Sequence, residues 1–290
     1  MEIQSTNLNL KQIAESGQCF RMKEINDGRY SLIAFGEYAE LHQAADNRVK
    51  IIESTIKDIS FWEKYFDIGY DYEKIVSCLI EGEDDFLRKA AIFGSGLRIL
   101  RQEPFEALIS FIISQNKNIP AIRNSIEKLS RNYGEERQIP QGSIGGEGTS
   151  YYTFPTAERL AVAGKEELRA MGLGYRDEYV HGAAKAVAEG RLDLNRLKTL
   201  ECDVIMSELM SIKGVGKKVA SCVALFGFHQ MSAVPVDVWI ERVDREIYGG
   251  GFDWKRYGHI AGLIQQYMFY YIRSGTDIAD VSGEDEKCRF

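Results

Sequence analysis

Apolar and polar positions alternate over short runs up to Asp58, and a period of two residues is typical of β-strands. The clearest runs cover residues 29–36, 38–42 and 49–52. Turn-forming residues precede the first and third of them, at 26–28 and 45–47. The pattern predicts an N-terminal sheet of antiparallel strands.

From Asp58 onward the apolar positions follow a helical period. Between Pro104 and Ser114 they recur at 105, 108, 109, 112 and 113, which is one helix face, and Pro104 suits a first turn. Comparable patterns predict helices over further ranges: 156–170, 176–189, 203–212, 217–228, 238–248 and 255–273.

A glycine-rich stretch over residues 141–150 predicts a loop, which we interpret as a seam between two helical subdomains. The chain after Gly275 is acidic. The sequence therefore predicts an α+β protein with a sheet domain over residues 1–95. A helical domain of two subdomains over 96–275 and an acidic tail over 276–290 are expected to follow.

The composition is that of an ordinary globular chain, with 44% hydrophobic and 27% charged residues among 290. A net charge of −7 argues against nucleic acid as a partner, because phosphate binding usually requires an excess of Lys and Arg. The average conceals one basic segment, residues 88–131, in which eight Lys and Arg stand against three Glu. Nucleic acid therefore stays open as a partner.

The five cysteines are widely spaced, with no C-x-x-C pair: Cys19, Cys78, Cys202, Cys222 and Cys288. We expect neither a disulfide framework nor a metal site, and no cofactor. No apolar run approaches the roughly 18 residues that cross a membrane, and the start of the chain lacks the pattern of a signal peptide. The expectation is a soluble, cytoplasmic protein without a membrane partner.

The residues with the clearest chemistry lie between Leu209 and Arg245. A helix is expected to end at Ile212, and four residues form a tight turn before the next helix: Lys213, Gly214, Val215 and Gly216. The amides of this turn and of the following helix start would face outward as an anion site suited to phosphate. Taken alone, the turn is equally consistent with an ordinary corner between helices.

Two further residues give this hairpin a context. Lys218 shares a helix face with Cys222, beside the apolar stripe and at the positive end of the helix dipole. Asp237 lies nineteen residues later, after Pro235 and Val236, and would cap another helix. A structural lysine and a purely capping aspartate are the simpler interpretations.

The hairpin, Lys218 and the run 234–237 together resemble the helix-hairpin-helix base-excision glycosylases, the HhH-GPD superfamily. Within it the chain resembles 8-oxoguanine DNA glycosylases with lyase activity. Further segments occur in family order, over residues 16–21, 101–118, 172–176 and 261–269, so the resemblance spans about residues 10–272. It implies a TBP-like N-terminal sheet and two helical subdomains that flank a lesion cleft.

The resemblance also implies a mechanism. Lys218 would attack the sugar C1′, displace the damaged base and form a Schiff base, from which β-elimination nicks the strand. Burial, the helix N-terminus and neighbouring Lys217 all favour the neutral amine that this attack needs. Asp237 would stabilise the cationic sugar. The implied protein is a monomeric enzyme, a DNA glycosylase and abasic-site lyase, acting on double-stranded DNA in a nucleoid or a nucleus.

The base must leave the duplex before it can be excised. In the resemblance, Gln265 reads its Watson–Crick edge, Phe269 stacks on one face and Cys222 covers the other. The carbonyl of Gly17 would accept the N7–H of 8-oxoguanine, a donor that guanine lacks. The simpler interpretation of Phe269 is a helix stripe that packs in the core, although this would not account for a pocket-facing Gln265. The simpler interpretation of Gly17 is a glycine in a turn before a strand.

Other residues would contact the duplex at the position that the extruded base has vacated. Asn116 would fill the vacated stack, Tyr175 would act as a wedge, and Arg176 would read the orphaned cytosine. Two positions depart from the vertebrate-type pattern. Ala121 replaces a second cytosine-reading arginine, and Trp239 replaces a phosphate-contacting histidine, so cytosine preference and that phosphate contact are both in question.

Several other functions fit parts of the sequence. Endonuclease-III-like enzymes usually carry a C-terminal four-cysteine cluster, and only Cys288 lies near that end. Alkylation-repair glycosylases lack the lysine. A glycosylase/lyase for another oxidised or alkylated base, and a non-catalytic helix-hairpin-helix DNA-binding protein, remain as alternatives. A nucleotide-binding enzyme is excluded because no G-x-G-x-x-G or G-x-x-x-x-G-K-[ST] motif is present.

Overall fold

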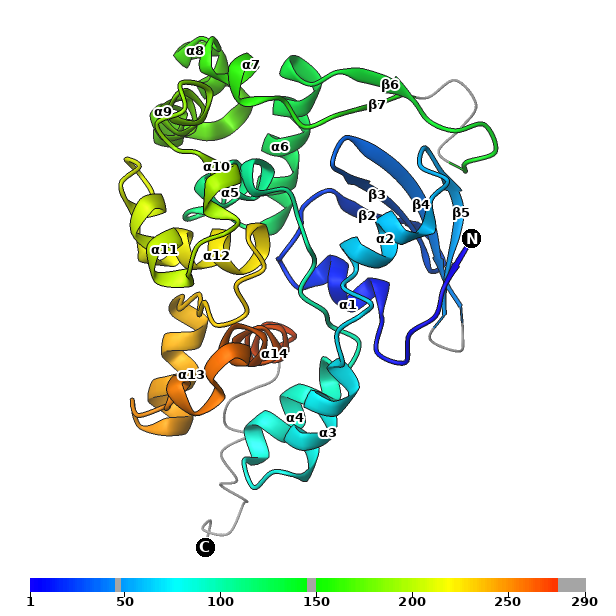
Figure 1. Ribbon diagram of the computed structural model, residues 1–290, viewed down its shortest axis with the longest axis vertical. Helices are drawn as coiled ribbons and strands as arrows, with labels where there is room; N and C mark the ends of the chain where they lie inside the picture. Colours follow the sequence, from blue (N-terminus) through cyan, green and yellow to red (C-terminus); the bar gives the residue numbers. More distant parts are fainter. Residues whose placement is uncertain (45–47, 145–149, 276–290) are drawn as a thin grey trace, which may run out of the picture.

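The computed structural model describes residues 1–44, 48–144 and 150–275. Its N-terminal part is a five-stranded antiparallel sheet with the strand order β1-β5-β4-β3-β2 (Figure 1). The strands are β1 Glu2–Ile3, β2 Met22–Asn26, β3 Arg29–Ala34, β4 Glu37–Gln43 and β5 Val49–Ser54. The three strand runs expected from the sequence correspond to β3, β4 and β5.

Two helices cover one face of this sheet, α1 Leu10–Glu15 and α2 Ile59–Tyr65 (Figure 1). Trp62 of α2 is fully buried, and its indole donates a hydrogen bond to Ser54 Oγ at 3.0 Å. Apolar residues from the strands and both helices form one core cluster. The sheet is therefore amphipathic, as its alternating sequence predicts.

The next helices are α3 Tyr72–Glu81, α4 Asp85–Phe93, α5 Pro104–Ser114 and α6 Ile119–Tyr133. The bounds of α5 match the prediction, and the helix is buried at nine of its positions. It packs against α12, Lys217–Gly227, where Phe111 stacks on Phe226 with ring centroids 5.3 Å apart. These two helices form the centre of the helical part.

The glycine-rich stretch belongs to a β-hairpin instead of a seam between helical subdomains, so that interpretation was wrong. It connects β6 Glu136–Gln138 to β7 Ser150–Tyr152, with residues 145–149 outside the described part. The hairpin packs on the N-terminal sheet (Figure 1): Tyr151 lies 5.5 Å from Tyr38 between ring centroids, and its hydroxyl donates to the Gly36 carbonyl at 3.1 Å. These tertiary contacts, which local composition does not encode, position β7 against the sheet.

A group of short helices follows: α7 Ala157–Ala161, α8 Lys165–Leu168, η1 Arg169–Leu173, η2 Gly174–Arg176, α9 Asp177–Ala188 and α10 Leu194–Leu197. The single helix expected over 156–170 is interrupted because Gly164 is extended and caps α8. Gly172 has φ +82°, a left-handed conformation that ends regular helix before Tyr175.

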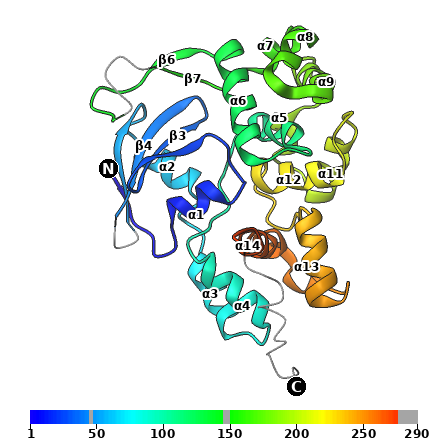
Figure 2. The same ribbon diagram turned by 180° about the vertical axis from the view of Figure 1, so that it is seen from behind.

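The last helices are α11 Cys202–Met210, α12, α13 Val238–Tyr248, η3 Trp254–Ile260 and α14 Ala261–Arg273. The helix expected over 255–273 is divided, because Gly258 has φ +48° and breaks the first part from α14. Both views place α14 between α13 and the α3–α4 pair (Figures 1 and 2), and residues of all these helices except α3 belong to one buried cluster.

The α+β class is confirmed, whereas the domain boundaries at 95 and 275 stay predictions. The helices α3 and α4 lie within the first expected domain, yet α4 packs directly on α14. The acidic tail lies outside the described residues. Within residues 1–44, 48–144 and 150–275, no helix has the length and apolar character needed to span a bilayer.

Candidate active site and DNA-binding surface

The predicted hairpin is present between α11 and α12. Gly214 has φ +88°, and a Cβ built on it would lie 2.2 Å from Cγ of Tyr179, so no side chain fits there. Gly216 forms the N-cap of α12, and a Cβ at this position would meet nothing within 4 Å. The first amides of α12 thus start from an exposed glycine, as an anion site at a helix N-terminus requires.

An open groove of about 500 Å³ runs along this hairpin. Its lining includes Lys213 to Gly216 of the hairpin, together with Tyr175 and Tyr179. Gln115 also lines it, and its side-chain amide donates a hydrogen bond to the Gly214 carbonyl at 3.1 Å. The hairpin and the predicted wedge therefore share one surface.

Lys218 lies one residue inside α12 and is half-buried, whereas Lys217 is exposed. Its Nζ is 5.8 Å from the centroid of the Phe111 ring. Burial raises the pKa of the Cys222 thiol, and the Lys218 ammonium beside it opposes that rise. The amine thus lies between an aromatic ring and a neutral thiol, away from bulk solvent on two sides.

Asp237 is the N-cap of α13. Its Oδ1 accepts hydrogen bonds from the amides of Trp239 and Ile240, both at 3.1 Å, which fixes the orientation of the carboxylate. The carboxylate is close enough to act electrostatically on Cys222, the residue that also interacts with Lys218. The capping role is present, and it holds the carboxylate in the neighbourhood of the predicted nucleophile.

The residues predicted to hold the base come from two distant segments. Gly17 has φ +76°, and a Cβ on it would lie 3.5 Å from Cε1 of Phe269. Gln265, one turn earlier on α14, is only 3% exposed. Its Oε1 is buried and has no hydrogen-bond partner among the described residues, which is unusual for a native amide and suits a group that awaits a ligand.

The turn that carries Gly17 is held by two glutamines that sequence reasoning missed. Gln266 donates to the Ser16 carbonyl at 2.7 Å, and fully buried Gln18 donates to the Arg98 carbonyl at 2.8 Å. Both neighbours of Gly17 are thereby fixed. No described residue donates a hydrogen bond to the Gly17 carbonyl itself.

The residues predicted to enter the duplex, Asn116 and Tyr175, contact each other. Asn116 has φ +49° and is exposed, and its side-chain amide donates to the Tyr175 hydroxyl at 3.2 Å. Tyr175 is 51% exposed, as expected of a residue that contacts DNA. Arg176 is buried, with its guanidinium 4.4 Å from the Tyr175 ring centroid and Nε 2.7 Å from the Gln115 carbonyl. In the free protein Arg176 supports the wedge, and its reading of cytosine stays a prediction.

Lys117 and Arg273 join the site without having been predicted. Lys117 donates to the Gly172 carbonyl at 2.7 Å and thereby connects the Asn116 loop to the Tyr175 loop. Arg273 lies four residues after Phe269, and its guanidinium carbon is 5.1 Å from that ring centroid. The i to i+4 spacing on one helix could have identified Arg273, whereas no sequence pattern marks Lys117.

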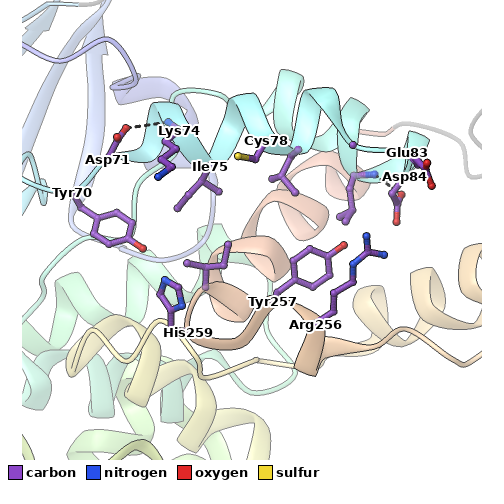
Figure 3. Close-up of a pocket in the computed structure, with 14 residues that line it drawn as sticks. Tyr70, Asp71, Lys74, Ile75, Cys78, Glu83, Asp84, Arg256, Tyr257 and His259 are labelled. Atoms are coloured by element: carbon purple, nitrogen blue, oxygen red, sulfur yellow. Dashed lines mark hydrogen bonds between the residues drawn. The ribbon is translucent and has the colours of Figure 1, made fainter.

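A separate cavity of about 510 Å³ lies between α3 and η3 (Figure 3). Tyr70, Ile75, Cys78 and Tyr257 are among the residues around it. None of the predicted site residues lines this cavity. The cavity is therefore distinct from the surface described above.

Two family models together match most of the chain. The 8-oxoguanine DNA glycosylase N-terminal domain matches residues 1–108, and the HhH-GPD superfamily base excision DNA repair protein matches residues 109–257. A probable N-glycosylase/DNA lyase of Methanothermobacter thermautotrophicus is 30% identical over 240 residues, which is 73% of each chain.

Solved structures agree with these matches. The 8-oxoguanine glycosylase/lyase of Clostridium acetobutylicum, in complex with double-stranded DNA that has cytosine opposite 8-oxoguanine, superposes with a TM-score of 0.84 at 33% identity, covering 93% of both chains. MBOgg1, in complex with a low-affinity DNA ligand, gives the same score and coverage at 35% identity. The resemblance expected from the sequence is confirmed, and the chain belongs to the 8-oxoguanine glycosylase/lyase family within the HhH-GPD superfamily of base excision DNA repair proteins.

Proposed function

We propose that this protein excises 8-oxoguanine from double-stranded DNA and then cleaves the strand at the abasic site. The observation that carries the proposal is the position of Lys218, a half-buried amine beside Cys222, with the oriented carboxylate of Asp237 acting on the same thiol. A DNA-binding module without catalysis has no use for this arrangement. The protein would act on chromosomal DNA, in a nucleoid or a nucleus, as a monomer.

Recognition of the lesion would combine shape with one decisive hydrogen bond. The extruded base would lie between Phe269 and Cys222, and its Watson–Crick edge would satisfy the unpartnered Oε1 of Gln265. The Gly17 carbonyl would accept the N7–H of 8-oxoguanine. Guanine has an acceptor at N7, so it would leave that carbonyl unpaired, at a cost of about 1–3 kcal/mol.

The chemistry would begin with the lone pair of neutral Lys218, which forms a bond to C1′ of the sugar. The bond between C1′ and the base nitrogen breaks, and its electron pair leaves with the base, which takes up a proton. Asp237 stabilises the positive charge that develops on the sugar. Opening of the sugar ring gives the Schiff base, with the ring oxygen protonated and the nitrogen bonded doubly to C1′.

The Schiff base would then make strand cleavage possible. It acidifies the protons on C2′, and loss of one of them allows the bond from C3′ to its phosphate oxygen to break. The phosphate leaves with the electron pair, and the strand is nicked on the 3′ side of the lesion. Hydrolysis of the remaining imine frees Lys218.

The DNA would be held by two parts of the surface. The exposed amides at the start of α12 and the hairpin before it would bind phosphates of the lesion strand. Asn116 and Tyr175 would enter the duplex and occupy the space left by the base, with Arg176 at the opposite cytosine. The groove that joins the hairpin to Tyr175 supports this arrangement.

Borohydride trapping tests the proposal, because borohydride reduces a Schiff base to a stable covalent adduct. Wild-type protein should be trapped on a duplex that contains 8-oxoguanine, and Lys218→Gln should not. Lys185→Gln is the control, since Lys185 is an exposed lysine of α9 whose ammonium pairs with Glu189 at 3.7 Å, and this variant should be trapped like the wild type. The proposal fails if the wild type gives no adduct, or if the Lys218 variant still gives one.

A further inference from the structure

Arg273 ends α14 and lies against two walls of the predicted base pocket. Its guanidinium carbon is 5.1 Å from the Phe269 ring centroid. Its Nη1 is 3.5 Å from the position that a Cβ on Gly17 would occupy, and Phe269 Cε1 is at the same distance from that position. An aromatic ring has two faces, so this guanidinium and an extruded base can both stack on Phe269.

Arg273 is exposed at the end of α14, so its guanidinium is open to a ligand. Among the described residues, no group accepts a hydrogen bond from its guanidinium, which contacts the ring of Phe269 instead. By contrast, buried Arg98 donates to the Asn7 carbonyl at 2.6 Å, and Arg176 donates to the Gln115 carbonyl at 2.7 Å. A guanidinium has five N–H donors in a planar fork, and none of those of Arg273 is bound by a described residue.

The surroundings of Arg273 favour an anion over a neutral ligand. The side chain of Arg273 is exposed, and among the described residues no carboxylate forms an ion pair with it. Its charge is therefore not neutralised by a described group and is open to an anion. A phosphate fits best, because it carries a full negative charge and accepts two parallel hydrogen bonds from a guanidinium.

The first turn of the neighbouring helix α13 offers no cation to such a phosphate. The first turn of α13, which follows Asp237, presents Val238 at 72% exposure and Trp239 at 38%, and its charged residue is acidic Glu241. The indole of Trp239 is a neutral donor with a single N–H. A phosphate attached to a sugar at Asp237 would meet no cation on that turn.

We propose that Arg273 binds the phosphate next to the extruded nucleotide and thereby positions its sugar for Lys218. This inference rests on the proposed function, since it concerns the nucleotide that the site would excise. The end of α14 would thereby supply the charged phosphate contact that the neutral indole of Trp239 cannot make.

A duplex with a tetrahydrofuran abasic-site analogue tests the contact directly, because it keeps the phosphates but has no base and cannot be excised. Arg273→Gln should bind this duplex at least about tenfold more weakly than wild type. The slope of log affinity against log salt should become shallower by about 0.9, the value for one lost phosphate contact. Arg273→Lys should keep most of the slope.

Two further variants complete the test. Arg191→Gln removes an arginine whose guanidinium pairs with Glu189 at 2.9 Å at the end of α9, and it should leave affinity and slope unchanged. Trp239→His in the Arg273→Gln background should restore part of the affinity at pH 6, where the imidazole is charged. Thermal unfolding of each variant checks that the fold is intact.

Wild-type affinity and slope in Arg273→Gln would overturn the inference. It would also be overturned if this variant slowed excision of 8-oxoguanine but bound the tetrahydrofuran duplex normally, because the contact would then be to the base. Neither result affects borohydride trapping by the wild type, so failure of this inference is distinguishable from failure of the proposed function.

Discussion

The side-chain amide of Asn116 donates a hydrogen bond to the hydroxyl of Tyr175 at 3.2 Å, across 59 residues of sequence. Asn116 holds a left-handed backbone conformation, φ +49°, and Lys117 beside it binds the Gly172 carbonyl at 2.7 Å. Two loops are thus joined before any DNA is present. We infer that the wedge is preorganised, so that DNA binding need not bear the full entropy of ordering it.

Two substitutions of Tyr175 should distinguish the contribution of its ring to excision from that of its hydroxyl. Tyr175→Ala removes the wedge and should slow single-turnover excision opposite cytosine by at least about tenfold, or ~1.4 kcal/mol. Tyr175→Phe keeps the ring and should stay within about threefold of wild type. The deficit of Tyr175→Ala should shrink when the lesion is mispaired, since a mispaired base costs less to extrude. Equal deficits on paired and mispaired duplexes would contradict a wedge role.

The two glycines of the hairpin should respond differently to alanine. Gly214→Ala places a methyl group 2.2 Å from Tyr179 Cγ at a positive φ, so it should lower the free energy of unfolding by about 2–4 kcal/mol. Gly216→Ala meets open space and should leave stability within about 1 kcal/mol of wild type.

The affinity for DNA should also distinguish the Gly214→Ala and Gly216→Ala variants. The new methyl group at position 216 faces the exposed start of α12, where a phosphate is expected, so Gly216→Ala should weaken binding to duplex DNA several-fold. Urea unfolding and fluorescence anisotropy measure the two effects independently. Unchanged affinity in a folded Gly216→Ala protein would show that the α12 amides do not hold DNA.

The helices that carry the site were predictable, because each has a strong apolar stripe and clear end signals. The predicted range 217–228 differs from α12 by one residue, and the predicted 238–248 equals α13. The contacts between segments were not predictable in the same way. Lys117 and Arg273 act through tertiary packing, on Gly172 and Phe269 respectively, and local periodicity contains no information about such pairs.

The breaks in the helical pattern have a similar origin. Gly258 divides a stretch that reads as one helix, because a single glycine is compatible with both a continuous helix and a left-handed kink. The packing of α14 between α13 and α4 selects the kink. Sequence reasoning therefore identified the residue types of the site but not the kink that precedes α14, the helix that carries Gln265 and Phe269.

Ala121 should set a weak preference for the base opposite the lesion. It lies in the first turn of α6, where its amide donates to the capping Asn118 at 2.9 Å, and its side chain is half-exposed. We expect wild-type excision rates opposite C, A, G and T to lie within about tenfold of each other. Ala121→Arg should favour cytosine by roughly a further tenfold, as a bidentate contact to a base is worth about 1–3 kcal/mol.

Ala121→Gln is the control for side-chain length without charge, and it should shift the preference less. Single-turnover rates on four duplexes that differ only in the opposite base measure the effect. A steep preference for cytosine in the wild type would show that another residue reads that base. Substitution of Arg176 would then be the next experiment.

Glu106 should make the stability of the protein depend on pH. Burial raises the pKa of this carboxyl to about 7, Arg21 opposes the rise, and Glu103 adds to it. Because the folded-state pKa lies above the ordinary value of 4.5, the native state binds an extra proton between about pH 4.5 and pH 7. The contribution of Glu106 is therefore complete below pH 4.5 and is lost as the pH rises through 7.

Glu106→Gln should remove most of this dependence, because glutamine resembles the protonated acid at every pH. At pH 8 the variant should be more stable than wild type by about 3 kcal/mol, and at pH 4.5 the two should be similar. Glu166→Gln, in the exposed first turn of α8, controls for loss of one negative charge. Urea unfolding at both pH values measures the difference. A Glu106→Gln protein that is less stable than wild type at pH 8 would mean that the carboxylate is held there by Arg21 as an effective ion pair.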